Sequence, residues 1–321
     1  MTTDTTLRAE RPVARLARLD LNLLVILREL LRERNVTRAA ERLAVTQPAA
    51  SAALARLRRH FDDPLLVRRK GHYELSPLAA QLAEQVELAC AAAERVFATE
   101  AEFDPASTTR EFTLLMADYT IAIMGERLSQ LFEQLAPRAK LHVRLVRESL
   151  SAEAGDTIRL VDGIVAPPMS SLMLPYLRSL ELFRDRWVCV AWEGNRALAG
   201  GTASAEDLAR LTWVAPYLPD LGRPWNAPVS RQFAVLGIQP HAAVRVESYQ
   251  AVPYFITGTD RVALMQERLA DTLAERLELK VIACPGPAEA IVEALWWREE
   301  LDDDPAHVWL RQILSDAAHA L

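Results

Sequence analysis

Two short amphipathic patterns, separated by a tight turn, stand out between residues 35 and 60 of the chain. Their apolar positions recur at intervals of three and four, the spacing of one helix face: Ala39, Ala40, Leu43, Ala50, Leu54 and Leu57. Thr37 and Thr46 stand where an N-cap would begin each helix, and Pro48 suits a first turn, where its missing N–H costs nothing. The pattern predicts two short helices joined along an apolar seam.

The other face of the second predicted helix is polar and basic, carrying Gln47, Ser51, Ala52, Arg56 and Arg59. A close helix pair with such an outer face is what a helix-turn-helix needs to enter the major groove of DNA. The alternative is an ordinary helical hairpin with a solvated basic face. Charge favours DNA binding, because residues 15–70 hold 13 arginines and lysines against 6 acidic residues in a chain of net charge −6. A basic segment on an acidic body is typical of a module that binds phosphates.

Apolar patterns on both sides extend this unit. Residues 19–34 predict an amphipathic helix that supports the pair, and residues 64–75 predict two short strands around a glycine turn. The strands form a wing that places Arg68, Arg69 and Lys70 within reach of DNA phosphates. After Ser76, a helix to about Thr99 repeats apolar residues at four, four, three, four and three, the spacing of a coiled-coil seam: Leu78, Leu82, Val86, Ala89, Ala93 and Val96. This seam predicts dimerisation, which would present two recognition helices to two half-sites.

Several motifs carry a family resemblance. They are Leu-Asp-Leu-Asn-Leu-Leu from residue 19, Thr-Arg-Ala-Ala-Glu-Arg-Leu from residue 37, Thr-Gln-Pro-Ala-Ala-Ser from residue 46 and Leu-Leu-Val-Arg-Arg from residue 65. In these motifs the chain resembles the LysR-type transcriptional regulators. Residues 103–105, 258–263 and 304–311 resemble the nodulation-regulator (NodD) branch, which includes regulators of aromatic-compound degradation. Position and resemblance together predict these DNA-binding residues: Thr37, Arg38, Thr46, Gln47, Pro48, Ser51, Ala52, Arg56, Arg68 and Arg69.

From residue 110 the pattern changes to short apolar strands that alternate with helices, which predicts a parallel α/β body. The expected strands are residues 111–117, 141–147, 162–166, 187–191, 211–215, 243–246 and 261–265. The resemblance implies two periplasmic-binding-protein-like subdomains, of residues 110–183 plus 266–321 and of residues 184–265. The expected domains are therefore a winged helix-turn-helix at 15–76, a linker and dimerisation helix at 77–103, and an effector-binding domain at 110–321.

Ligand contacts are expected where strands end, because open parallel sheets bind ligands at the carboxyl ends of their strands. Asp118, Tyr119 and Thr120 follow the first strand, beside the free N–H groups of a helix start. The alternative for Thr120 is that it merely caps this helix. The resemblance places effector contacts here and at later strand ends: Ser149, Leu150, Pro216, Tyr217 and Met265. Trp213, Tyr217, Trp225 and Tyr249 would form either an aromatic wall or plain core.

Composition narrows the class of protein. Half of the residues are hydrophobic and a quarter are charged, as in a soluble globular protein. No apolar run approaches the length of a membrane span, and three distant cysteines suit neither a disulfide framework nor a metal site. There is no glycine-rich phosphate loop, nucleophile elbow or paired-histidine motif. The acidic run at 302–304 is better explained by Asp304 capping a helix than by metal binding. We expect a cytoplasmic location, no membrane, no metal and no cofactor.

The expected function is that of a DNA-binding transcriptional regulator controlled by a small, aromatic effector bound between two subdomains. Its expected partners are double-stranded promoter DNA, the effector, a second copy in a dimer or tetramer, and RNA polymerase if it activates transcription. Two alternatives belong to other classes. One is an architectural DNA-binding protein without a ligand, and the other is an α/β enzyme, since folds of this kind host many reactions.

Overall fold

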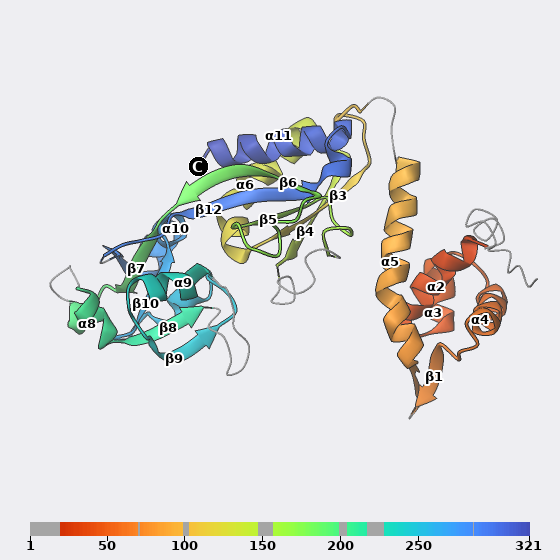
Figure 1. The fold of residues 1–321 in the computed structure, drawn as a ribbon, viewed down its shortest axis with the longest axis horizontal. Coiled ribbons are helices and arrows are strands. Elements are labelled where there is room, and N and C mark those ends of the chain that lie inside the picture. The colour runs from red at the N-terminus through yellow and green to blue at the C-terminus, as the bar shows by residue number, and fades with distance from the viewer. Residues whose placement is uncertain are drawn as a thin grey trace, which may run out of the picture. The chain divides into compact units, whose positions relative to one another are not determined.

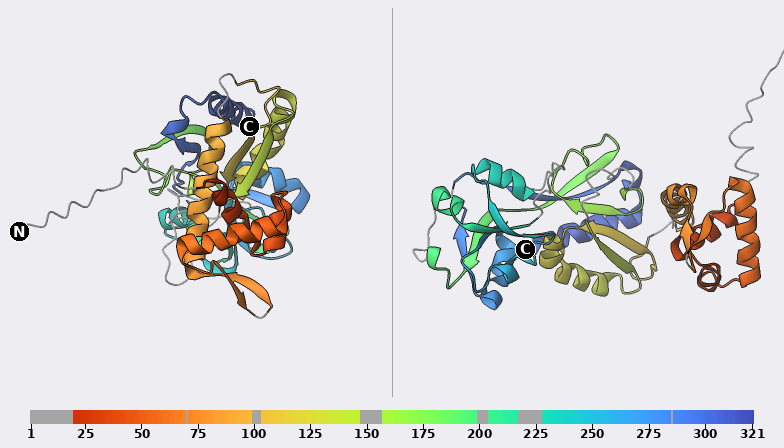
Figure 2. Two further views of the ribbon diagram at one scale, coloured as in Figure 1. Left: turned by 90° about the vertical axis from the view of Figure 1, so that its right-hand side faces the viewer. Right: turned by 90° about the horizontal axis from the view of Figure 1, so that it is seen from below.

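The computed structural model describes residues 20–69, 71–98, 103–146, 157–198, 204–216, 228–284 and 286–321. The chain divides into two compact units, residues 1–99 and residues 100–321 (Figures 1 and 2). None of the helices in the described ranges has the length and apolar character needed to cross a bilayer.

The first unit contains every element that the sequence predicted for it. In chain order these are α2 (Asn22–Glu33), α3 (Val36–Arg42), α4 (Gln47–Phe61), β1 (Leu66–Arg69), β2 (His72–Leu75) and α5 (Pro77–Ala98). Strands β1 and β2 pair antiparallel as the predicted wing. One apolar cluster joins the helices, and its buried members include Leu27, Leu30, Ala39, Leu54, Leu57, Leu65, Val86 and Cys90. The seam predicted between the two short helices is therefore part of a larger core.

Helix α5 packs against α2, and this divides the predicted coiled-coil seam. Val86 is only 4% exposed and belongs to the core of the unit itself, and Leu82 packs against that core. Arg32 of α2 donates two hydrogen bonds, of 2.5 and 2.6 Å, to the Glu87 carboxylate of α5. Val96 is 71% exposed. The apolar surface that α5 leaves for a second copy is therefore narrower than the sequence pattern predicted.

The second unit is built on two five-stranded sheets (Figure 1). The first has the order β4-β3-β5-β12-β6, with β3 (Glu111–Met116), β4 (Lys140–Leu145), β5 (Gly163–Ala166), β6 (Leu177–Asp185) and β12 (Ile291–Arg298). The second has the order β11-β7-β10-β8-β9, with β7 (Trp187–Trp192), β8 (Thr212–Pro216), β9 (His241–Val246), β10 (Val262–Gln266) and β11 (Leu279–Ala283). The predicted two-subdomain α/β architecture is confirmed.

Both sheets are mixed, which corrects the prediction of a parallel body. Strands β3, β4 and β5 are parallel to one another, as are β8, β9 and β10. Strand β12 runs antiparallel to β5 and β6, and β7 runs antiparallel to β10 and β11. The antiparallel strands carry the chain between the sheets, since only Arg186 separates β6 from β7. A direct crossing of this kind needs no intervening helix.

The return crossing also lies later than expected. The predicted boundary at residue 266 would place α10 (Glu267–Leu277) and β11 with the first sheet. Instead β11 pairs with β7 of the second sheet, so the chain returns between residues 283 and 291. Strands β6, β11 and β12 were not predicted.

The second unit also contains α-helices and short 3₁₀ helices, the latter labelled η. They are α6 (Asp118–Leu135), η1 (Arg196–Leu198), α8 (Ala205–Ala209), α9 (Pro228–Val235), η2 (Val252–Phe255), η3 (Glu299–Leu301) and α11 (Pro305–His319). As predicted, Asp304 caps α11, accepting hydrogen bonds from the Ala306 and His307 N–H groups. Helix α6 begins directly after β3, so its first turn lies at the carboxyl end of a parallel strand.

Candidate functional site

Helices α3 and α4 form the predicted helix-turn-helix. Thr46 caps α4, accepting a hydrogen bond from the Ala49 N–H at 3.4 Å, as expected. The cap of α3 is Asn35 rather than Thr37, because the Asn35 side-chain oxygen accepts from the N–H groups of Thr37 and Arg38 at 2.9 and 3.1 Å. Thr37 is exposed, and capping does not occupy its hydroxyl.

The solvent face of α4 carries most of the residues predicted to read DNA. Ala50, Ala53, Leu54 and Leu57 are buried, whereas Gln47, Pro48, Ala52 and Arg56 are exposed. Gln47 donates a weak 3.4 Å hydrogen bond to Ser51 one turn later. The Arg56 Nη2 donates to the Asp20 carboxylate at 2.8 Å. This partner was not predicted, because it lies 36 residues away in the sequence.

The wing is held to α4 by Arg58, which sequence reasoning did not select. Its guanidinium donates to the carbonyl oxygens of Pro64 and Leu66 at 2.8 and 3.1 Å. Arg68 and Arg69 lie exposed at the end of β1, and Arg69 has a loose 3.6 Å contact with Glu74. Arg58 therefore has a structural role, whereas Arg68 and Arg69 are exposed cations of the wing, and Lys70 lies outside the described residues.

Arg38 at the start of α3 is exposed, and its guanidinium lies 3.7 Å from the Glu33 carboxylate. Arg42 makes closer pairs with Glu29 and Glu33, at 3.2 and 3.0 Å. The Arg38–Glu33 pair is long and its arginine side chain is 64% exposed, and surface pairs of this kind contribute little to stability. The Arg38 guanidinium therefore lies at the surface and is only loosely paired.

In the second unit, the three residues predicted at the start of α6 are all buried. The Asp118 carboxylate accepts hydrogen bonds from the Ser248 hydroxyl at 2.6 Å and the Gln250 N–H at 3.0 Å. The Gln250 side-chain amide donates to the Asp118 carbonyl oxygen at 2.7 Å. Ser248 and Gln250 follow β9, so these bonds connect α6 with the second sheet. In this arrangement Asp118 links the two subdomains.

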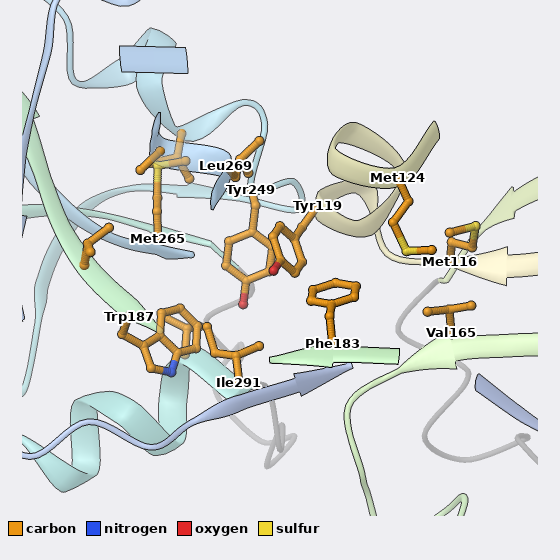
Figure 3. Close-up of a cluster of buried hydrophobic side chains, with 14 of the residues drawn as sticks. Met116, Tyr119, Met124, Val165, Phe183, Trp187, Tyr249, Met265, Leu269 and Ile291 are labelled. Atoms are coloured by element: carbon orange, nitrogen blue, oxygen red, sulfur yellow. The ribbon is translucent and has the colours of Figure 1, made fainter. Parts of the chain in front are cut away.

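Tyr119 reaches the crossing between the sheets (Figure 3). Its hydroxyl donates to Asp185 Oδ2 at 2.5 Å, while Asp185 Oδ1 accepts from the Arg186 N–H at 2.7 Å. Burial raises the pKa of Tyr119, and the Asp185 charge raises it further. The Tyr119 ring packs edge-on against Phe183 of β6, at 6.2 Å between ring centres. Tyr119 therefore fixes α6 to the residue before the crossing.

Thr120 is fully buried beside Glu293 of β12. Glu293 lies where the β12–β6 register shifts, and such a bulge can redirect a side chain. Burial raises the pKa of Glu293 to about 8, with the Thr120 hydroxyl opposing the shift and the Asp185 charge adding to it. Among the described residues, neither Glu293 Oε2 nor Thr120 Oγ1 has a well-aligned hydrogen-bond partner. Two buried polar groups thus face each other at the start of α6.

The remaining predicted contacts separate into two groups. Pro216 ends β8 and is buried, and Met265 of β10 is fully buried in the cluster of Figure 3. Ser149, Leu150, Tyr217 and also Trp225 lie outside the described residues. Of the other aromatic candidates, Trp213 packs against Phe233 in the core. Tyr249 packs instead near Trp187, at 6.4 Å between ring centres, a contact that was not predicted.

A cavity of about 170 Å³ lies where the two sheets meet. Its lining comes from the end of β5, the start of β7, the start of α9 and the start of β12, and includes Pro167, Pro168, Trp187, Pro228, Arg231 and Ile291. It is apolar apart from Arg231 and Glu289, whose side chains pair at 3.4 Å. Because residues from both sheets line it, a molecule bound here would contact both. Within the described ranges, no three metal-ligating side chains gather.

Two parts of the chain match known domain families. Residues 21–80 match the bacterial regulatory helix-turn-helix protein, lysR family, and residues 127–318 match the LysR substrate binding domain. It is 30% identical to Nodulation protein D 2 of Rhizobium tropici over 304 residues, which is 94% of this chain and 93% of the relative. It is 31% identical over 306 residues to Nodulation protein D 2 of Bradyrhizobium diazoefficiens, covering 94% and 89% of the two chains.

Solved structures agree with these matches. A probable transcriptional regulator from Pseudomonas aeruginosa has a TM-score of 0.71 and 26% identity, with 94% of this chain and 98% of that chain covered. Full-length CbnR complexed with its target DNA has a TM-score of 0.64 at 16% identity, covering 94% and 99%, and is a likeness of fold alone. The relatives are regulators rather than enzymes, as predicted. The chain belongs to the LysR family of DNA-binding transcriptional regulators.

Proposed function

We propose that this regulator reads promoter DNA with α4 and the wing, and that a small effector bound between its two sheets controls it. The exposed polar and basic face of α4, beside a wing with the exposed cations Arg68 and Arg69, is the observation that carries the DNA-binding part. Gln47 at the start of α4 suits an adenine edge and Arg56 suits guanine, while the Ser51 hydroxyl can pair with either kind of base. Thr37, Arg38, Thr46, Pro48 and Ala52 complete the proposed contact surface.

Selection from a random DNA duplex library tests this part directly. The wild-type protein is expected to enrich one sequence with two related half-sites. Gln47→Ala should relax the preference at one base pair of each half-site. Recovery of no sequence preference would favour an architectural protein instead.

Arg68→Ala and Arg69→Ala are expected to weaken binding to all duplexes by a similar factor. Phosphate contacts carry no sequence information, and each one lost lowers the slope of log K against log salt by about one. Titrations of the selected site and of a scrambled duplex at several salt concentrations measure this. Arg196→Ala is the matched control, because its side chain is 90% exposed in the second unit. A loss confined to the selected site, with an unchanged salt slope, would show that the wing reads bases.

The effector part rests on the cavity lined by both sheets and on the buried polar groups at the start of α6. A ligand that contacts both sheets favours one arrangement of the subdomains, and it can shift only states that it binds unequally. Trp187 at the cavity and the resemblance to the nodulation-regulator branch support an aromatic effector. Asp118, Tyr119, Thr120, Pro216 and Met265 are not part of the lining of this cavity, and the resemblance is what supports them as proposed contacts, together with Ser149, Leu150 and Tyr217.

Thr120→Val is expected to weaken the effector response while operator binding stays intact. The change removes the hydroxyl and keeps the shape of the side chain. A thermal-shift screen with aromatic acids, phenols and flavonoids first identifies a stabilising compound, since a ligand at 100 times its Kd adds about 2.7 kcal/mol. The same compound is then titrated against Thr120→Val. An unchanged midpoint would remove Thr120 from the site, and no stabilising compound in a broad library would favour ligand-independent regulation.

We further propose self-association through the exposed face of α5, as a dimer or tetramer, and a cytoplasmic location. Val96 and the exposed Ala89 and Ala93 form the part of the predicted seam that the core of the first unit leaves uncovered. If the protein activates transcription, RNA polymerase is its further partner.

A further inference from the structure

Asp20 contacts α4, the proposed recognition helix, although Asp20 is not part of that helix. It precedes α2, and its Oδ1 accepts a hydrogen bond from the Asn22 N–H at 3.1 Å. Its Oδ2 accepts from Arg56 Nη2 at 2.8 Å. One carboxylate oxygen is thus fixed by the backbone of α2, and the other holds a guanidinium on α4. The Arg56 hydrogen bond is also the main cause of the lowered pKa of Asp20.

This pair contributes little to the stability of the fold. The Arg56 and Asp20 side chains are 51% and 34% exposed. Ion pairs this open to solvent add little to the free energy of unfolding. The first unit already has its own apolar core across α2, α4 and α5. A role in stability therefore does not account for the contact.

Arg56 differs in this respect from the other arginines of α4. Arg58 is bound to the backbone of the wing, and exposed Arg59 has no ion pair within the described part of the unit. Arg56 is the arginine of this helix that a carboxylate orients. A guanidinium has five N–H donors in a fixed fork, so one can bind Asp20 while others remain for the N7 and O6 acceptors of guanine.

We infer that Asp20 is a positioning residue that sets the base specificity of Arg56. Holding one side of the fork reduces the rotamer freedom that Arg56 must lose on binding a base. The Asp20 charge also opposes nearby phosphates, so it lowers affinity for DNA of any sequence. Asp20 therefore raises discrimination at some cost in general affinity. This inference rests on the proposed base-reading role of α4.

Asp20→Asn separates these effects. The asparagine oxygen can still accept from the Asn22 N–H, but its NH₂ group cannot accept from Arg56. We expect the preference for guanine at one base pair per half-site to fall at least about threefold. A complete arginine–guanine contact provides a preference of about 5- to 150-fold, which corresponds to about 1–3 kcal/mol. Affinity for a scrambled duplex should stay equal or rise, and the melting temperature should be unchanged. A purely structural role would lower both affinities together.

Glu87→Gln is the matched control, because it removes the same charge from another ion pair of the unit, with Arg32. It should leave base preference unchanged. Preferences are read by selection from a duplex library and by titration of the selected site and its single-base variants. An unchanged or sharper preference in Asp20→Asn, or an unchanged one in Arg56→Ala, would overturn the inference. Failure of the proposed function looks different, because the wild-type protein itself would then select no sequence.

Discussion

Val86→Glu is expected to unfold the first unit and abolish binding to every DNA duplex. Val86 is 4% exposed on α5 and packs in the cluster that includes Leu27 and Leu30 of α2. A carboxylate there would be buried without a partner, at a cost of several kcal/mol. A domain has only about 5–15 kcal/mol of stability in total. Thermal unfolding followed by circular dichroism, together with DNA titration, measures the loss.

Val96→Glu introduces the same side chain on the same helix and serves as the control. Val96 is 71% exposed, so the charge stays in water and the fold should survive. If α5 joins two copies through this face, sedimentation should show a smaller species for Val96→Glu, and operator affinity should fall. A stable dimer in this variant would place the interface elsewhere. Normal melting and DNA binding in Val86→Glu would instead contradict the packing of α5 on α2.

The first unit could be predicted almost completely, because its features are local in sequence. Apolar spacing located α2 to α5, and Thr46 was recognised as a cap from its position before Pro48. The assignment of the α3 cap to Thr37 was wrong, since Asn35 two residues earlier also accepts hydrogen bonds well and lies at the helix start. The Asp20–Arg56 contact depends on how α2 packs against α4, and no spacing rule predicts it.

The second unit was less predictable, because its site is assembled from distant segments. Apolar runs revealed β3, β5, β7 and β10, whereas β12 was missed, because the buried but ionisable Glu293 interrupts its apolar residues. The start of α6 was recognised from strand-end geometry. Its partners Ser248 and Gln250 lie about 130 residues away, as their hydrogen bonds to Asp118 record. Strand ends therefore predicted where polar groups gather, but not which groups pair.

Glu293→Gln is expected to stabilise the second unit at neutral and alkaline pH. Burial raises the pKa of Glu293 from 4.5 to about 8, so the folded state holds a proton that the unfolded state releases. The stability linked to this proton is fully present below pH 4.5 and is lost as the pH rises through about 8. At pH 7 this proton linkage is expected to lower the free energy of unfolding of the wild-type protein by roughly 3 kcal/mol, at about 1.36 kcal/mol per pH unit. Glutamine keeps the shape and stays neutral, so its melting temperature should be higher by about 2–4 °C per kcal/mol.

The difference between the melting curves of Glu293→Gln and wild type isolates this effect from other groups. Carboxyls with a lowered pKa, such as Asp207 beside Ser204, change stability in the opposite direction and cancel in the difference. The gain should be small at pH 5 and grow towards pH 8. Glu275→Gln, at an exposed position of α10, should show no such trend. A gain that does not change with pH would mean that Glu293 is ionised in the folded protein, and Thr120 would then face a charge instead of a neutral acid.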